Sequence, residues 1–142
     1  TIEWLVKSGA TNSEGTTLTY QLVGRDSATW GNYWNSTFKY IAQNTEKPEL
    51  TENKYLNEDT EIPTGSAEYT KTNNIYDMAG NMDEWTTEVN ARWSRINRGG
   101  NYGSPDYSSP VVARGNFSQI NSIVKVRLSC HSLHQIKQLI NN

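Results

Sequence analysis

Apolar and polar positions alternate in several short stretches of the chain. The alternation is cleanest in IVKVRLS, residues 123–129, where apolar side chains face one way and Lys, Arg and Ser side chains face the other. A period of two is the pattern of a strand with one buried face. Shorter stretches of the same kind predict strands at residues 16–24, 37–41, 84–89 and 93–98. The Gly99-Gly100 pair is expected to end the last of these.

Helical spacing of apolar residues occurs at the two ends of the chain. In TIEWLVKSG, residues 1–9, Ile2, Leu5 and Val6 share one face, and Gly9 suits the left-handed position that ends a helix. The last residues, 131–142, also carry Leu and Ile at helical spacing. We expect a helix end at the start and an amphipathic tail that packs on the domain, mediates assembly or is foreign to it.

Two long segments lack either period. Residues 43–66 are polar and acidic and contain two Pro, which predicts a long, mostly exposed surface loop or insertion. In residues 101–122, twelve of 22 positions are Ser, Asn, Tyr or Gly, which predicts a largely irregular segment. The chain is therefore expected to form one mixed α+β domain over residues 1–142, with short strands, little helix and long ordered loops.

Composition narrows the class of protein. The 142 residues suffice for one core, and five Trp and eight Tyr can supply burial that a 35% apolar content would not. A net charge of -2 argues against binding to nucleic acids or to anionic membranes. The sequence contains no apolar run near 18 residues, so a membrane-spanning helix is not expected. No signal peptide is visible. Cys130 is the single cysteine, which excludes an internal disulfide.

One turn-rich run, NIYDMAGNMDEWT at residues 73–85, fits neither period. With INRGGNY at 96–102, VAR at 112–114 and a closing VKVR strand, it resembles the formylglycine-generating-enzyme-like branch of the C-type lectin fold. Val126 stands where Phe is usual in that last strand.

The resemblance, which covers about residues 1–129, implies an α+β C-type lectin fold with a small twisted antiparallel sheet. It also implies that the family's first strands are missing and that residues 130–142 form an extra tail. Within the fold, Trp85 would be buried, and Arg98 would be a core guanidinium that bonds loop carbonyls.

The resemblance also implies a calcium site in the turn. Carried over by position, Asp77 and Glu84 would offer carboxylate oxygens, and Gly80 and Met82 backbone carbonyls. Calcium prefers several hard oxygen ligands on a flexible loop, which agrees with this set. Asp83 stands where Trp is usual, so it either adds an oxygen near the ion or places a charge where a ring packs. The alternative is a tight turn with solvated acids and no metal.

Catalysis is not expected. Family members that oxidise a substrate Cys hold copper with two thiolates, and Ser104 and Ser109 stand at those positions, so the resemblance implies no copper. Another branch uses His-ligated iron, but His131 and His134 would supply too few ligands for such a site. We expect them to be surface residues. We expect Cys130 to be a small residue at the end of a strand and not a nucleophile. The alternative is an enzyme, or an enzyme-accessory domain, of the same family.

Binding is the remaining function. Residues 91–122 mix aromatic and Arg side chains with Ser, Asn and Gly, which suits an adaptable recognition surface as well as an ordinary loop-rich one. Bacterial and phage relatives include variable proteins of diversity-generating retroelements, and the resemblance implies a domain displayed on a bacterial surface or virion that binds an unknown protein or glycan. The candidate contacts, expected to be exposed on one side above buried Arg98 and Trp85, are Trp93, Arg95, Asn101, Tyr102, Asp106, Tyr107, Arg114 and Asn116.

Overall fold

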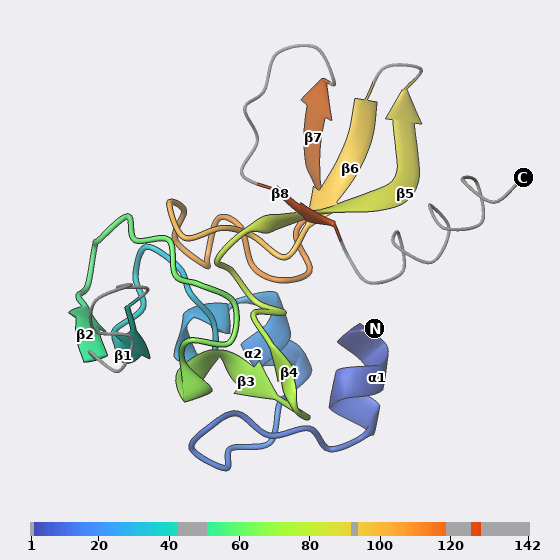
Figure 1. Ribbon diagram of the computed structural model, residues 1–142. Helices are drawn as coiled ribbons and strands as arrows, with labels where there is room; N and C mark the ends of the chain where they lie inside the picture. The colour runs from blue at the N-terminus through green and yellow to red at the C-terminus, as the bar shows by residue number, and fades with distance from the viewer. Residues whose placement is uncertain (1, 43–50, 92–93, 119–125, 129–142) are drawn as a thin grey trace, which may run out of the picture.

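The computed structural model describes residues 2–42, 51–91, 94–118 and 126–128 (Figure 1). The helical segments in these ranges are short. They are α1 (Ile2–Lys7), α2 (Tyr20–Gly24) and the 3-10 turns η1 (Ser27–Thr29) and η2 (Glu68–Thr70). No helix in these ranges has the length and apolar character needed to cross a membrane.

The strands form small, mainly antiparallel sheets. Two are two-stranded: β1 (Phe38–Ile41) with β2 (Thr51–Lys54), and β3 (Lys71–Thr72) with β4 (Ile75–Tyr76). The third has the order β7-β6-β5-β8. Its strands are β5 (Asp83–Ala91), β6 (Ser94–Arg98), β7 (Gly115–Ser118) and β8 (Val126–Leu128).

The four-stranded sheet is mixed. The β5–β6 and β6–β7 pairs are antiparallel, but β8 lies parallel to β5, with Trp85 opposite Leu128. The expected antiparallel pairing is thus found for β5–β6 and β6–β7 but not at the β5–β8 edge. The β5–β6 register shifts twice between Trp85 and Ala91, so simple alternation fails along β5.

The hydrophobic core lies in the helical half of the molecule, away from most of the four-stranded sheet (Figure 1). Its largest side chains, Trp30 and Tyr33, are 0% exposed and pack with residues of α1 and α2. Ala79 and Val111 join the same cluster from later in the chain. The run at 73–85 and the loop between β6 and β7 are thus both fastened to the core.

The strand predicted at residues 16–24 is wrong, because Tyr20–Gly24 form α2. Thr19 caps this helix, and its side chain accepts a hydrogen bond from the Leu22 amide at 3.3 Å. A strand would bury Tyr20 together with Leu18, but Tyr20 is 61% exposed while Val23 is fully buried. Tertiary burial of Val23 overrides the local alternation.

The other predicted elements are largely confirmed where the structure describes them. The strands at 37–41, 84–89 and 93–98 appear as β1, β5 and β6, and β8 covers part of 123–129. Gly9 has a φ of 68°, as the helix end requires.

The predicted loops need adjustment. The described part of 43–66 is mostly exposed, as expected, but β2 lies within it and Lys54 is buried. Residues 101–114 carry no strand, and β7 follows them. Trp85 is half-buried rather than buried. The tail at 130–142, with Cys130, His131 and His134, lies outside the described residues.

Candidate functional site

Gly80, in the run at 73–85, lies close against the backbone of Asn32. Its φ is 69°, and a Cβ added there would overlap the backbone carbonyl of Asn32. The Gly80 amide donates to the Gly99 carbonyl at 2.7 Å, and the Tyr33 hydroxyl donates to the same oxygen at 2.7 Å. Glycine is required here because only it combines this φ with this contact.

Asn81 ties three segments together and is 2% exposed. Its Oδ1 accepts from the Ile62 amide and from Asn32 Nδ2, both at 3.1 Å, and its Nδ2 donates to the Ile62 carbonyl at 2.9 Å. Its backbone carbonyl accepts from the Tyr102 amide at 3.1 Å. Gly80 and Asn81, the Gly-Asn turn, are therefore scaffold residues whose polar groups are hydrogen-bonded within the fold.

The four candidate calcium ligands lie around this turn. A Cβ on Gly99 would lie 3.8 Å from both the Met82 carbonyl oxygen and Glu84 Cγ, so both groups lie beside Gly99. Asp77 is 2% exposed, and its Oδ2 accepts from the Gly65 amide at 3.3 Å. The Gly80 carbonyl accepts from the Met82 amide. The oxygens are of the type that calcium prefers, and calcium binding stays a prediction.

Asp83, at the position where the resemblance implies that Trp is usual, is buried inside the scaffold. Its Oδ2 accepts from Asn101 Nδ2 at 2.7 Å. Burial raises the pKa of Asp83, while hydrogen bonds from Asn101 and Asn97 oppose that rise. Asn101, a candidate contact, is thus half-buried and engaged with the scaffold.

Two other candidate contacts are buried, so the expectation that they are exposed is wrong. Tyr102 is 3% exposed and Asp106 is 5% exposed. The Asp106 carboxylate accepts from the Ala28 amide and from Asn35 Nδ2, both at 2.8 Å, and its own amide donates to Asn35 Oδ1 at 3.0 Å. The loop at 101–114 folds back onto the core half, and these contacts fasten it there.

Arg98 bonds a loop carbonyl as expected: its Nη1 donates to the Val112 carbonyl at 3.1 Å. Its side chain is 36% exposed, however, so the expected burial is wrong. Glu88 forms ion pairs with both Arg98 and Arg114. Hydrogen bonds from these two side chains lower the pKa of Glu88, and the bond from Arg114 has the larger effect. Arg114, another candidate contact, is therefore held against β5 while remaining 49% exposed.

Tyr107 is the candidate contact that best meets the expectation, with 73% exposure. Arg95 is half-buried and pairs in register with Phe117 of β7. The backbone of Asn116 pairs with Ile96 in the sheet, and the position of its side chain is not among the described features. Trp93 lies outside the described residues. The structure therefore does not gather all eight residues on one exposed face.

An open cleft of about 450 Å³ lies beside Tyr107. We name it the Tyr107 cleft; its lining residues are Arg25, Asp26, Ala28, Thr29, Asn35, Ser36, Thr37, Tyr69, Asp106 and Tyr107. Tyr69 forms one rigid part of the wall, because its ring stacks on Phe38 with centroids 4.7 Å apart and its hydroxyl donates to the Ala28 carbonyl at 2.6 Å. Burial raises the pKa of Tyr69 to about 12, so it remains a neutral phenol.

Sequence reasoning found Asp106 and Tyr107 but missed the rest of the Tyr107 cleft. Residues 25–37 and Tyr69 carry no motif that marks a site, and they meet Tyr107 only through the tertiary structure. Comparison with family models, with curated proteins and with solved structures found no match to this chain. The resemblance to the formylglycine-generating-enzyme-like branch therefore remains a hypothesis that rests on the motifs themselves.

Proposed function

We propose that this protein is a non-catalytic ligand-binding domain, displayed on a bacterial surface or phage particle, that binds its ligand through Tyr107 and the Tyr107 cleft. The observation that carries the proposal is the contrast between neighbours in one loop. Asp106 is 5% exposed and hydrogen-bonded, whereas Tyr107 is 73% exposed. An aromatic side chain held out by a buried anchor offers a large contact area.

Preorganisation supports this reading. The Asp106 carboxylate fixes the loop to Ala28 and Asn35, and the Ser108 and Ser109 amides both donate to the Pro105 carbonyl. A ligand would therefore order few additional groups on binding, which lowers the entropic cost of association. Substitution of Tyr107 would change the contact surface and leave these anchors in place.

The cleft suits a ligand with both polar and apolar parts. Arg25 and Asp26 supply charges, Thr29 and Thr37 supply hydroxyl groups, and Tyr107 supplies a ring. This mixture of one exposed aromatic with adaptable polar groups is typical of recognition surfaces. The ligand is a protein or a glycan. The absence of catalysis follows, in this proposal, from Ser104 and Ser109 at the positions where related oxidases have thiolates.

Sequencing this locus in many isolates of the source strain tests the proposal. If the domain is a diversified binder, adenine-directed substitutions should concentrate in the codons for residues 91–122 beside an invariant copy. Within that window they should change the exposed Tyr107 and spare the buried Asp106 and Tyr102. Uniform drift across the chain would refute diversification, and substitutions that fall as often on Asp106 as on Tyr107 would refute the assignment of the contact face.

A further inference from the structure

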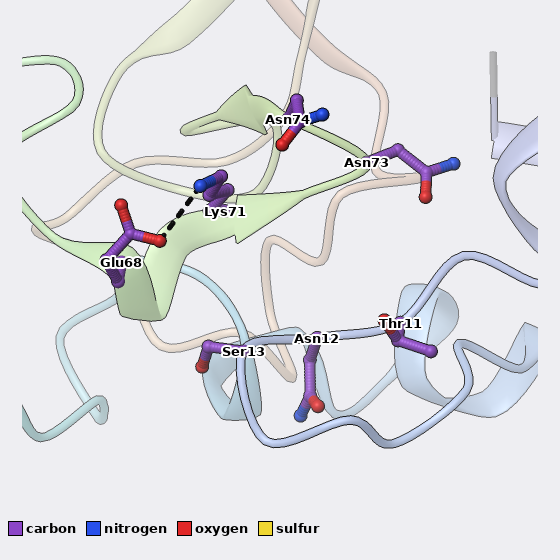
Figure 2. Close-up of a pocket in the computed structure, with 7 residues that line it drawn as sticks. All are labelled: Thr11, Asn12, Ser13, Glu68, Lys71, Asn73 and Asn74. Atoms are coloured by element: carbon purple, nitrogen blue, oxygen red, sulfur yellow. Dashed lines mark hydrogen bonds and ion pairs between the residues drawn. The ribbon is translucent and has the colours of Figure 1, made fainter.

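A second open hollow, of about 390 Å³, lies between the loop at residues 11–13 and the β3–β4 hairpin (Figure 2). We name it the polar groove. Every residue that lines it is polar, and the set is Thr11, Asn12, Ser13, Glu68, Lys71, Asn73 and Asn74. Its volume falls in the range of about 300–1,000 Å³ that small-molecule sites occupy, but such sites are usually lined by apolar residues. Its occupant must therefore be polar over most of its surface.

The walls of the groove are held in place from both sides. Asn73 and Asn74 have φ values of 46° and 60°, as the central residues of a tight type I′ hairpin turn require. The Thr72 hydroxyl donates to the Thr11 carbonyl at 2.9 Å and so joins the hairpin to the facing loop. The Asn12 amide points away from the hairpin in Figure 2, and its oxygen accepts from the Glu14 and Thr16 amides. The groove is thus preorganised.

The charges in the groove neutralise each other. Glu68 and Lys71 form an ion pair at 3.0 Å, drawn as a dashed line in Figure 2. The Tyr76 hydroxyl also donates to the Glu68 carboxylate. The hydrogen bonds from Tyr76 and Lys71 lower the pKa of Glu68, and the bond from Tyr76 has the larger effect. A paired carboxylate and ammonium leave little net charge to attract a phosphate or a polycation.

Uncommitted hydrogen-bonding groups are among the residues that line this neutral space. Within the described residues, the side chains of Thr11, Ser13 and Asn74 make no hydrogen bond, and all three residues are exposed. Hydroxyl and amide groups both donate and accept, and so do the hydroxyl groups of a sugar. We propose that the polar groove is a binding site for a neutral saccharide, separate from the Tyr107 cleft.

The groove is suited to binding rather than cleavage. Hydrolysis of a glycosidic bond generally uses two carboxyl groups about 5–9.5 Å apart. Glu68 is the one carboxylate in the described lining, and it is already bonded to Lys71 and Tyr76. A bound saccharide would therefore be retained intact.

The test is an NMR titration of the folded protein with neutral sugars: glucose, galactose, mannose, N-acetylglucosamine and their common disaccharides. Inorganic phosphate and glucuronate serve as anionic comparisons. At least one neutral sugar should shift the side-chain amide signals of Asn73 and Asn74 more than either anion does. Asn74→Gly and Ser13→Ala should each weaken that binding by about tenfold, because each removes a hydrogen-bonding group.

Asn57→Gly is the matched control for Asn74→Gly, because Asn57 is also exposed, has a φ of 63° and lies outside the groove. It should leave sugar binding unchanged, as should Tyr107→Ala in the separate cleft. The proposal is overturned if none of the sugars shifts these signals, if an anion binds more tightly, or if Asn74→Gly and Ser13→Ala leave the affinity unchanged. Loss of binding in the Tyr107 variant would also overturn it, because the site would then be the Tyr107 cleft.

Discussion

The Gly-Asn turn and the loop at residues 101–114 carry similar residue types but differ in what they expose to solvent. In the turn, Asn81 is 2% exposed and every polar atom of its side chain is bonded. In the loop, a buried Asp106 directly precedes a Tyr107 that is 73% exposed. A chemically suggestive motif can thus be scaffold, while the accessible surface lies where one anchored residue holds its neighbour outward.

The sharpest way to break this comparison is to substitute Gly80. Gly80→Ala should destabilise the fold by about 4 kcal/mol or more, because the new methyl group overlaps the Asn32 backbone carbonyl. Gly9→Ala is a matched control: Gly9 has nearly the same φ, 68°, but nothing within 4 Å of the added Cβ. It should cost about 1–2 kcal/mol. Equal losses in urea unfolding would show that the close approach at Gly80 does not matter.

The second prediction compares the two neighbours in the loop. Asp106→Ala should lower the free energy of unfolding by about 2–4 kcal/mol, because it leaves the Ala28 amide and the Asn35 side chain without their acceptor. Tyr107→Ala should change it by less than about 0.5 kcal/mol, as exposed substitutions usually do. Chemical denaturation of both variants measures the difference. A Tyr107 variant as unstable as the Asp106 variant would contradict the division into anchor and contact.

The third prediction asks whether the turn also holds metal. If Asp77, Gly80, Met82 and Glu84 bind calcium, free calcium at 100 times its dissociation constant should stabilise the protein by about 2.7 kcal/mol. A thermal melt should then shift by about 5–10 °C on chelation. Asp77→Asn and Glu84→Gln should each abolish the shift, and Asn tolerates the left-handed φ of 57° at position 77. An identical melt with calcium and with chelator would refute the site.

The smallest expected effect concerns Asp83, which joins β5 to the loop. Burial raises its pKa, so the folded state favours the protonated acid. This contribution to stability is full below the unfolded pKa and is lost as pH rises through the folded pKa. Asp83→Asn should therefore gain stability relative to the parent as pH rises from the acid range to neutrality, since Asn can still accept the bond from Asn101. A constant difference between the two proteins over that range would contradict the assignment.

Part of the fold was predictable from local pattern. Alternation predicted β1, β5, β6 and part of β8, and the cap-forming Gly9 was predictable because few other residues adopt its φ. The strand predicted over α2 failed because a short stretch can fit both periods. Burial of Val23 at 0% exposure and exposure of Tyr20 at 61% depend on the core, which no local pattern encodes.

The candidate site was less predictable than the fold. Its residues were chosen by type, but Tyr102 and Asp106 proved buried and Arg114 paired with Glu88. A carboxylate can serve a ligand or anchor a loop, and the choice depends on donors elsewhere in the chain. Asp106 meets the Ala28 amide, 78 positions away in sequence.

By itself, the sequence determined the backbone conformations that particular side chains favour: Gly9 in the left-handed position that ends a helix, and alternating residues in the strands β1, β5 and β6. These preferences arise between atoms of neighbouring residues, so they can be read locally. Only the tertiary structure decided which surfaces are hollow. The Tyr107 cleft joins residues 25–37 to Asp106 and Tyr107, and the polar groove joins residues 11–13 to the β3–β4 hairpin. Both depend on long-range burial, which brings together segments with no local relation to each other.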